Sequence, residues 1–368
     1  MDKQSHPFRG PLQFEEAYME RVWGGDKMAR ILGKDTPKGK TIGESWMIAH
    51  HAQHTSVVAH GPLQGQTLGQ LIAQDKAALL GSRPRLTRHG QFPLLLKILD
   101  AASPLSVQVH PDDAAAIRLN EPDVGKTEMW QVLHGDADSE LICGLQPGVD
   151  AEQFRAAIEN ETVGDLLNRF PAPAGTAVFL PAGTVHAIGS NLLIAEIQQN
   201  SDLTYRVYDW GRVGLDGKPR DLHIEKACAV TRFEDGHTGA TTPLGFKQDG
   251  AEIKVLAVCE HFAAAHLSLT GTLCRTINGE SFHILLCESG TLSVACLEQD
   301  VHLSPGNAVL IPGSAPDFQI QGTGCLLDYY VPDLQQDIVA PLLEVGHAPA
   351  AILALGGCES TNALRGLL

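Results

Sequence analysis

The sequence has few positive charges and no apolar run long enough to cross a membrane. Lysine and arginine number 27 against 43 acidic residues, so the formal net charge is -16. A protein that binds nucleic acid needs a broad positive surface, so this charge argues against a nucleic-acid partner. No stretch of about 18 apolar residues occurs, which argues against a membrane partner. The first residues, MDKQSHPFRG, lack the apolar core of a signal peptide, and we expect a cytoplasmic protein.

Paired-cysteine motifs are also absent. None of the eight cysteines forms C-x-x-C, and most lie in apolar, strand-like runs near the end of the chain. This pattern indicates buried free thiols in a reducing compartment. The positions are Cys143, Cys228, Cys259, Cys274, Cys287, Cys296, Cys325 and Cys358.

Helical patterns are sparse, whereas glycine (37) and proline (21) are frequent. Short alternating or β-branched runs bounded by these residues predict a mainly β fold. The clearest runs are 45–51, 104–110, 126–133, 177–181 and 192–198. Apolar residues at helical spacing predict helices only near 67–80 and 150–170, the latter with Asp150 as N-cap.

The length of 368 residues favours two domains of roughly 150 residues or more. The polar, glycine-rich stretch 235–250 marks the boundary, so we expect a domain at 1–240 and a second at 241–368. In the second, 283–294 is expected to form two strands around Glu288 to Gly290. The stretch 303–316 weakly repeats the Pro/Gly rhythm of 173–186. The last ten residues are expected to be a loosely held tail.

Several polar residues share strand faces in the first domain. Because side chains alternate along a strand, Ser106, Gln108 and His110 lie on one face, as do Lys126 and Glu128. A Pro-x-Gly turn delivers His186 to the start of another strand. Two imidazoles, one carboxylate and one amide oxygen suit a catalytic zinc ion, which keeps a coordination position open.

The order of motifs PLSVQVHPDD, GKTEMW, PAGTVHAIG and NSDLTYRVYDWGR resembles the type I mannose-6-phosphate isomerases, in their short bacterial form. The stretches ERVWGG, GESW, FPLLLKILDA and LHIEKA extend the resemblance over roughly residues 10–230. The resemblance implies two cupin-type (jelly-roll) β-barrels with a few helices on the first. It also implies interconversion of D-mannose 6-phosphate and D-fructose 6-phosphate. The implied ligands of one Zn²⁺ per chain are Gln108, His110, Glu128 and His186.

The same resemblance implies the substrate-handling residues. Arg206, which follows Asn200-Ser201-Asp202, is the implied catalytic arginine, and Ser106, Lys97 and Lys126 are implied to lie near the sugar phosphate. Proton transfer through a cis-enediol builds negative charge, which a guanidinium stabilises. The proton carrier stays open between Lys126 and a zinc-bound water, and Lys126 is equally suited to contact phosphate alone. Asp202 is expected to orient Arg206.

The second domain is expected to be a degenerate cupin without metal ligands, because Pro316 stands where His186 stands in the first repeat. Two other functions stay open. One is another metal-dependent cupin enzyme, such as a dioxygenase, although that class usually needs an H-x-H strand and this chain has Q-x-H. The other is a regulatory cupin that binds a sugar phosphate. A small phosphorylated sugar is the expected partner of a monomer or weak homo-oligomer.

Overall fold

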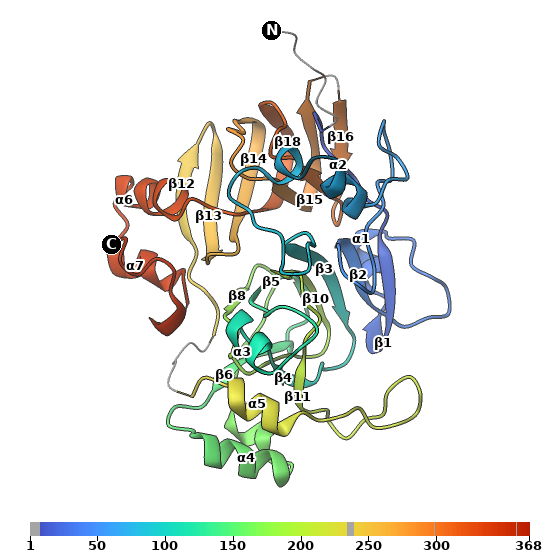
Figure 1. The fold of residues 1–368 in the computed structure, drawn as a ribbon, viewed down its shortest axis with the longest axis vertical. Coiled ribbons are helices and arrows are strands. Elements are labelled where there is room, and N and C mark those ends of the chain that lie inside the picture. Colours follow the sequence, from blue (N-terminus) through green and yellow to red (C-terminus); the bar gives the residue numbers. More distant parts are fainter. Residues whose placement is uncertain (1–7, 234–238, 298, 358) are drawn as a thin grey trace.

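A computed structural model describes residues 8–233, 239–297, 299–357 and 359–368. Helices are few and short, and the strands form three antiparallel sheets, so the mainly β fold is confirmed (Figure 1). A six-stranded sheet lies in the middle of the molecule, with a five-stranded sheet on one side and a seven-stranded sheet on the other.

The six-stranded sheet carries Lys97 and Glu128 of the predicted site. Its order is β1 (Ala17–Gly25), β2 (Ile42–Ile48), β3 (Leu94–Ala101), β10 (Leu192–Gln199), β5 (Glu128–Gly135) and β8 (Ala177–Leu180). The five-stranded sheet has the order β11 (Tyr205–Tyr208), β4 (Val107–Val109), β9 (His186–Ile188), β6 (Glu140–Leu145) and β7 (Leu167–Pro171). An apolar cluster that includes Trp130, Leu141 and Ile194 fills the space between these two sheets.

The seven-stranded sheet is formed by the C-terminal third of the chain. Its order is β12 (Leu244–Gln248), β13 (Ala251–Val258), β14 (Ala263–Arg275), β18 (Phe318–Tyr330), β15 (His283–Cys296) and β16 (Gln299–Leu303), and β17 (Ala308–Ile311) pairs with β15. One of its faces packs against the six-stranded sheet in the largest core cluster, which contains Leu96 of β3 and Leu327 of β18. Phe8, Leu12 and Phe14 join this cluster, and Leu12 pairs with Leu310 of β17.

The helices are separate from the three sheets and lie between the strands or after the last strand along the chain. They are α1 (Lys27–Leu32), α2 (Leu68–Leu80), α3 (Asp113–Arg118), α4 (Ala151–Glu159), α5 (Ile224–Val230), α6 (Ala340–Glu344) and α7 (Pro349–Ala354), with short turns at Val163–Leu166, Leu334–Val339 and Glu359–Thr361. The helix predicted at 67–80 is confirmed as α2, capped by Thr67, but its backbone breaks at Asp75, whose carboxylate accepts the N–H of Ala78.

The helix predicted over 150–170 is only half right. Asp150 caps α4 as expected, accepting the N–H of Gln153. The helix stops at Glu159, because Glu161 adopts a φ of 59° that a right-handed helix does not allow. Leu167–Pro171 is instead β7, which pairs with β6. Tertiary pairing has overridden the local helical pattern here.

Two expectations for the C-terminal third are wrong. Residues 283–294 form a single strand, β15, rather than two, because Ser289 and Gly290 stay paired with β18 on the far side of a bulge at Glu288. The last ten residues are not loosely held, since Leu364 is fully buried against α6 and α7.

The expectation of free thiols is confirmed for the cysteines that the structure describes, which exclude Cys358. They are not all buried. Cys274 is exposed, and Cys228 and Cys325 are partly exposed.

Candidate metal centre and active site

The backbone brings the predicted ligands together at one end of the five-stranded sheet. Gln108 is the central residue of β4, where it lies opposite His186 of β9 and opposite Arg206 of β11. Glu128 begins β5 in the facing sheet. The turn before His186 depends on Gly183, which has a φ of 90°, and a Cβ there would lie 2.8 Å from the carbonyl oxygen of Val230.

His110, Glu128 and His186 form a buried group whose ligand atoms all lie within 4.8 Å of one another. Nε2 of His110 lies 3.5 Å from Oε2 of Glu128, and Nε2 of His186 lies 3.4 Å from Oε1. His186 Nδ1 is 2.8 Å from the carbonyl of Thr184. Donation of the Nδ1 proton to that carbonyl leaves the Nε2 lone pair free for an ion.

Two of these atoms fit a bound cation particularly well. Within the part of the chain that the structure describes, Nε2 of His186 and Oε1 of Glu128 are buried and have no hydrogen-bond partner. Buried polar atoms without partners are costly, and a divalent ion would satisfy both at once. The side chain of Gln108 lines the cavity next to this group and can add an amide oxygen.

The histidines are in the protonation state that metal binding requires. Burial lowers the pKa of His186 to about 4, and burial and the nearby Lys126 charge hold the pKa of His110 well below its usual value. Both imidazoles are therefore neutral near pH 7, as ligands must be.

Lys126 lies against this group. Its Nζ is 2.6 Å from Oε2 of Glu128 and 3.1 Å from Nε2 of His110. Burial alone would lower the pKa of Lys126, but the charges of Glu128 and Glu196 outweigh it and raise the pKa above its ordinary value. The protein groups alone thus keep the proton on Lys126, whereas a lysine base needs a lowered pKa.

A cavity of about 630 Å³ adjoins the metal group and collects the other predicted site residues. Lys97, Ser106, Lys126, Asp202 and Arg206 all line it. The guanidinium Nε of Arg206 donates to the Ser106 hydroxyl at 3.2 Å, and Nη1 donates to the carbonyl of Asp221 at 2.9 Å. A guanidinium held by neutral oxygens at the wall of a cavity is available to bind an anion.

Asp202 and Arg206 were expected to pair, but no ion pair or hydrogen bond joins their side chains in the part of the chain that the structure describes. The Asp202 carboxylate instead accepts a hydrogen bond from the Gln53 amide at 2.7 Å, and its backbone N–H donates to Asp123. Asp202 therefore lies on the cavity wall beside Gln53.

Sequence reasoning missed two buried carboxylates beside Lys97. Nζ of Lys97 lies 3.6 Å from Glu44 and 3.8 Å from Glu196. Burial would raise the pKa of Glu44, but Lys97 and Arg21 outweigh it and lower the pKa to about 2. Burial and the charge of Glu128 raise the pKa of Glu196. The available signal was a single charged residue inside a strand, Glu44 in β2 and Glu196 in β10.

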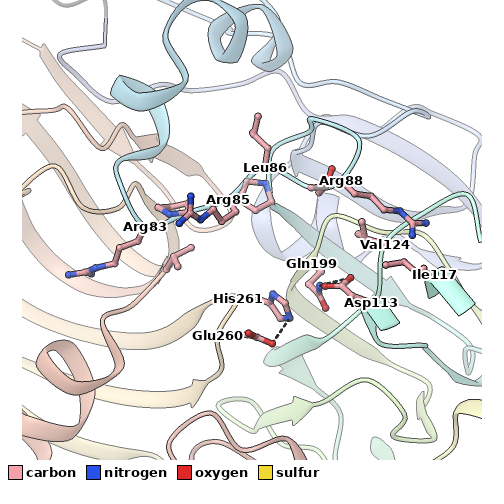
Figure 2. Close-up of a pocket in the computed structure, with 14 residues that line it drawn as sticks. Arg83, Arg85, Leu86, Arg88, Asp113, Ile117, Val124, Gln199, Glu260 and His261 are labelled. Carbon is pink, nitrogen blue, oxygen red and sulfur yellow. Dashed lines mark hydrogen bonds and ion pairs between the residues drawn. The ribbon is translucent and has the colours of Figure 1, made fainter. Parts of the chain in front are cut away.

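Figure 2 shows a second cavity, of about 410 Å³. Gln199 and Asp113 line it. Oε1 of Gln199 accepts the N–H of Thr127 at 2.9 Å, its Nε2 donates to Asp113 at 3.3 Å, and Asp113 accepts the N–H of Gly125 at 2.7 Å. These bonds fix the backbone on both sides of Lys126.

Comparisons with known proteins agree with this fold and site. Residues 12–129 match the model of the phosphomannose isomerase type I catalytic domain, and residues 252–331 match the cupin domain of mannose-6-phosphate isomerase. The mannose-6-phosphate isomerase of Streptococcus mutans is 35% identical over 313 residues, which cover 85% of this chain and 95% of that protein. A mannose-6-phosphate isomerase of Bacillus subtilis is 33% identical over 315 residues, with 85% and 96% covered.

The solved structures point the same way. The crystal structure of the mannose 6-phosphate isomerase from Bacillus subtilis matches with a TM-score of 0.79 and 30% identity, covering 87% of this chain and 99% of that one. The fold, the site and these matches define a mainly β enzyme of the isomerase class, with a cupin unit in its C-terminal third. The chain belongs to the type I phosphomannose isomerase family. Among the described residues, no helix is both long and apolar enough to cross a membrane.

Proposed function

We propose that this chain interconverts D-mannose 6-phosphate and D-fructose 6-phosphate by proton transfer through a cis-enediol intermediate. The proposal rests on one observation above all, the buried His110, Glu128 and His186 group beside a cavity lined by Lys97, Lys126 and Arg206. The names of the relatives support this substrate pair. The family assignment does not favour the alternatives of a different cupin enzyme or a regulatory cupin that binds a sugar phosphate.

The metal in this proposal is one Zn²⁺ per chain, held by Gln108, His110, Glu128 and His186. This set of two imidazoles, one carboxylate and one amide oxygen suits zinc and leaves access from the cavity side. When bound, the ion supplies Lewis-acid polarisation of a sugar oxygen.

Arg206 has the central role in binding the developing charge. Removal of the proton from C2 of the aldose, or from C1 of the ketose, leaves an enediolate whose negative charge sits on oxygen. The Arg206 guanidinium stays protonated and faces the cavity, where it can stabilise that charge. Ser106 holds the guanidinium by accepting from Nε. Lys97 and Lys126 add positive charge for the phosphorylated sugar.

Lys126 is the proposed proton carrier between the two carbons. Its amine lies within the buried group and lines the cavity, so it can reach a bound sugar. Glu128 holds a proton on this amine. Ligation of Glu128 to the proposed ion would offset part of its charge and so would favour release of that proton. Asp202, on the cavity wall beside Gln53, is proposed to orient the substrate rather than to move a proton.

Residues 1–240 are proposed as the catalytic domain and residues 241–368 as a cupin-like domain that supports it. We further propose that the protein is cytoplasmic and works as a monomer or weak homo-oligomer, without a nucleic-acid or membrane partner.

An isomerisation assay with mannose 6-phosphate, combined with metal analysis of the purified protein, tests the proposal. We expect fructose 6-phosphate to form, activity to disappear with chelation, and added Zn²⁺ to restore it. A zinc-loaded protein that does not turn over mannose 6-phosphate would refute the proposed reaction, and full activity after complete metal removal would refute the metal site.

Arg206→Ala tests the role of the guanidinium separately. Loss of a charge-stabilising group of this kind lowers turnover by about a hundredfold to a thousandfold. Metal content should be unchanged, and Arg206→Lys should recover only part of the activity, since an ammonium lacks the planar set of donors. A folded, zinc-loaded Arg206→Ala protein with wild-type turnover would contradict this role.

A further inference from the structure

The seven-stranded sheet has two different faces. Ala265 and Leu267 of β14 point into the apolar interior of the C-terminal third, whereas Ala264 and Leu327 face the six-stranded sheet. Side chains alternate along a strand, so His266 lies on the face turned toward the six-stranded sheet. This is not the face on which a cupin interior would hold a ligand.

Three potential metal ligands meet on that outer face, one from each of three adjacent strands. They are His266 of β14, Cys325 of β18 and Glu288 at the bulge of β15, and their ligand atoms all lie within 4.8 Å of one another. Nε2 of His266 is 2.8 Å from Oε2 of Glu288. Glu288 shares this face with Leu286, two residues before it on β15, and the bulge leaves Glu288 without a partner on β18.

A fourth polar group reaches the same place from the other sheet. Gln131 of β5 is only 2% exposed, and its Nε2 donates to Oε1 of Glu288 at 3.3 Å. Its own Oε1 is buried and has no hydrogen-bond partner among the residues that the structure describes. A buried amide oxygen without a donor costs free energy, and a cation would remove that cost.

We propose that His266, Glu288 and Cys325 bind a second transition-metal ion, with the Gln131 amide oxygen as a fourth ligand. Sulfur, nitrogen and oxygen donors together select a borderline-soft divalent ion of the zinc class over Mg²⁺ or Ca²⁺. The Cys325 thiol releases its proton to solvent when it becomes a ligand. The hydrogen bond between His266 and Glu288 is replaced by one bond from each residue to the ion.

The location indicates a structural role. Glu288, His266 and Cys325 belong to the seven-stranded sheet and Gln131 to the six-stranded sheet, so the ion would join the two sheets. Partial exposure of the three donors leaves a path for the ion from solvent. The second domain was expected to hold no metal ligands, because Pro316 stands where the turn of the first domain has His186, so this proposal departs from that expectation. Nothing in this site contacts the proposed substrate cavity.

Cobalt substitution distinguishes the two sites, because the proposed catalytic ligands include no sulfur. The metal-free full-length chain titrated with Co²⁺ should bind two ions and develop a thiolate-to-cobalt charge-transfer band. Cys325→Ser should bind one ion, lose the band and keep wild-type isomerase activity. Cys274→Ser removes an exposed thiol on β14, the strand that carries His266, and should retain both the band and the second ion.

Two further variants extend the test. One separates binding of the second ion from the proposed reaction, and the other is available if Cys325→Ser does not fold. His186→Ala should lose the first ion and activity but retain the charge-transfer band. His266→Gln should weaken binding of the second ion. If Cys325→Ser does not fold, His266→Gln serves as the test in its place. Binding of a single Co²⁺ without a charge-transfer band in the wild type would overturn the proposal. A band that persists in Cys325→Ser would overturn it as well.

Discussion

The two halves of this chain use antiparallel sheets for opposite purposes. Between the six- and five-stranded sheets, the buried side chains include charged and metal-ligating groups such as Lys97, Lys126, Glu128, His186 and Glu196. The interior of the seven-stranded sheet has an apolar core cluster, which includes Leu267, Leu285, Val294, Phe318 and Ile320, and its buried carboxylate, Asp328, is paired with His283 and Arg275. Because buried charges are costly unless paired, a polar sheet interior indicates chemistry and an apolar one indicates support.

The difference is visible in two similar turns. Pro181 to His186 delivers an imidazole to the metal group, whereas the corresponding turn at Pro312 to Pro316 delivers no ligand. The two interiors should therefore respond differently to substitution, one through activity and the other through stability.

The largest effect is expected at Glu128. Glu128→Gln keeps the side-chain volume but removes the charge that pairs with Lys126 and that would hold the proposed ion. A metal worth several kcal/mol to the transition state makes the expected loss of turnover roughly a thousandfold or more. Kinetics and metal analysis on the same sample check this. Wild-type turnover by a metal-depleted Glu128→Gln protein would contradict the idea that the polar interior of the first half serves catalysis.

Leu267→Ala probes the opposite interior. Leu267 is fully buried in the C-terminal core, so its truncation should lower the free energy of unfolding by about 2–5 kcal/mol. Urea unfolding measures the loss, and turnover of the folded fraction should be unchanged. A fall in turnover of fully folded protein would show that the C-terminal third takes part in catalysis directly.

The buried histidines predict a pH dependence for the metal-free protein. His186 has a folded pKa of about 4, below the unfolded value of about 6.5, so only the unfolded state gains its proton in between. Stability is therefore complete above about pH 6.5 and falls as the pH drops toward 4, by about 3 kcal/mol from this group. Urea unfolding across this range measures it. His186→Gln should weaken the dependence of stability on pH. His302→Gln, at an exposed position of β16, should leave that dependence unchanged.

A smaller effect is expected from Gln199→Ala, which removes the acceptor for Thr127 N–H between Lys126 and Glu128. Supporting residues around metal ligands typically contribute about tenfold to a hundredfold in affinity or activity, and we expect the lower end. The reduced zinc affinity should accompany the reduced turnover. Asn168→Ala, whose amide donates to a carbonyl of β6, is the matched control and should change neither.

The sequence was informative where a motif lies on one strand or turn. Gln108, His110, Glu128 and His186 were predicted from alternation and from the family resemblance, and the structure places the last three of these around one point. Alternation alone does not tell which strands face each other, so the neighbours of Lys97 were missed. Glu44 and Glu196 reach it from the strands on either side of β3.

Long-range pairing explains the other differences. The stretch after Glu159 has a helical pattern but becomes β7 because β6 offers it hydrogen bonds. The sequence indicated that Glu288 lies in a turn, but the pairing of β15 with β18 continues past it. Its contact with Gln131 joins residues on different sheets, and no local pattern predicts such a contact.

The pairing of Leu12 with Leu310 bears on how the chain is made in the cell. Phe8, Leu12 and Phe14 are synthesised well before β17 and the other C-terminal members of the core cluster that receive them. This core cluster therefore cannot close until the seven-stranded sheet has been synthesised, and the six-stranded sheet keeps an apolar face uncovered until then. Such a delay favours assistance from chaperones that shield apolar surface during synthesis.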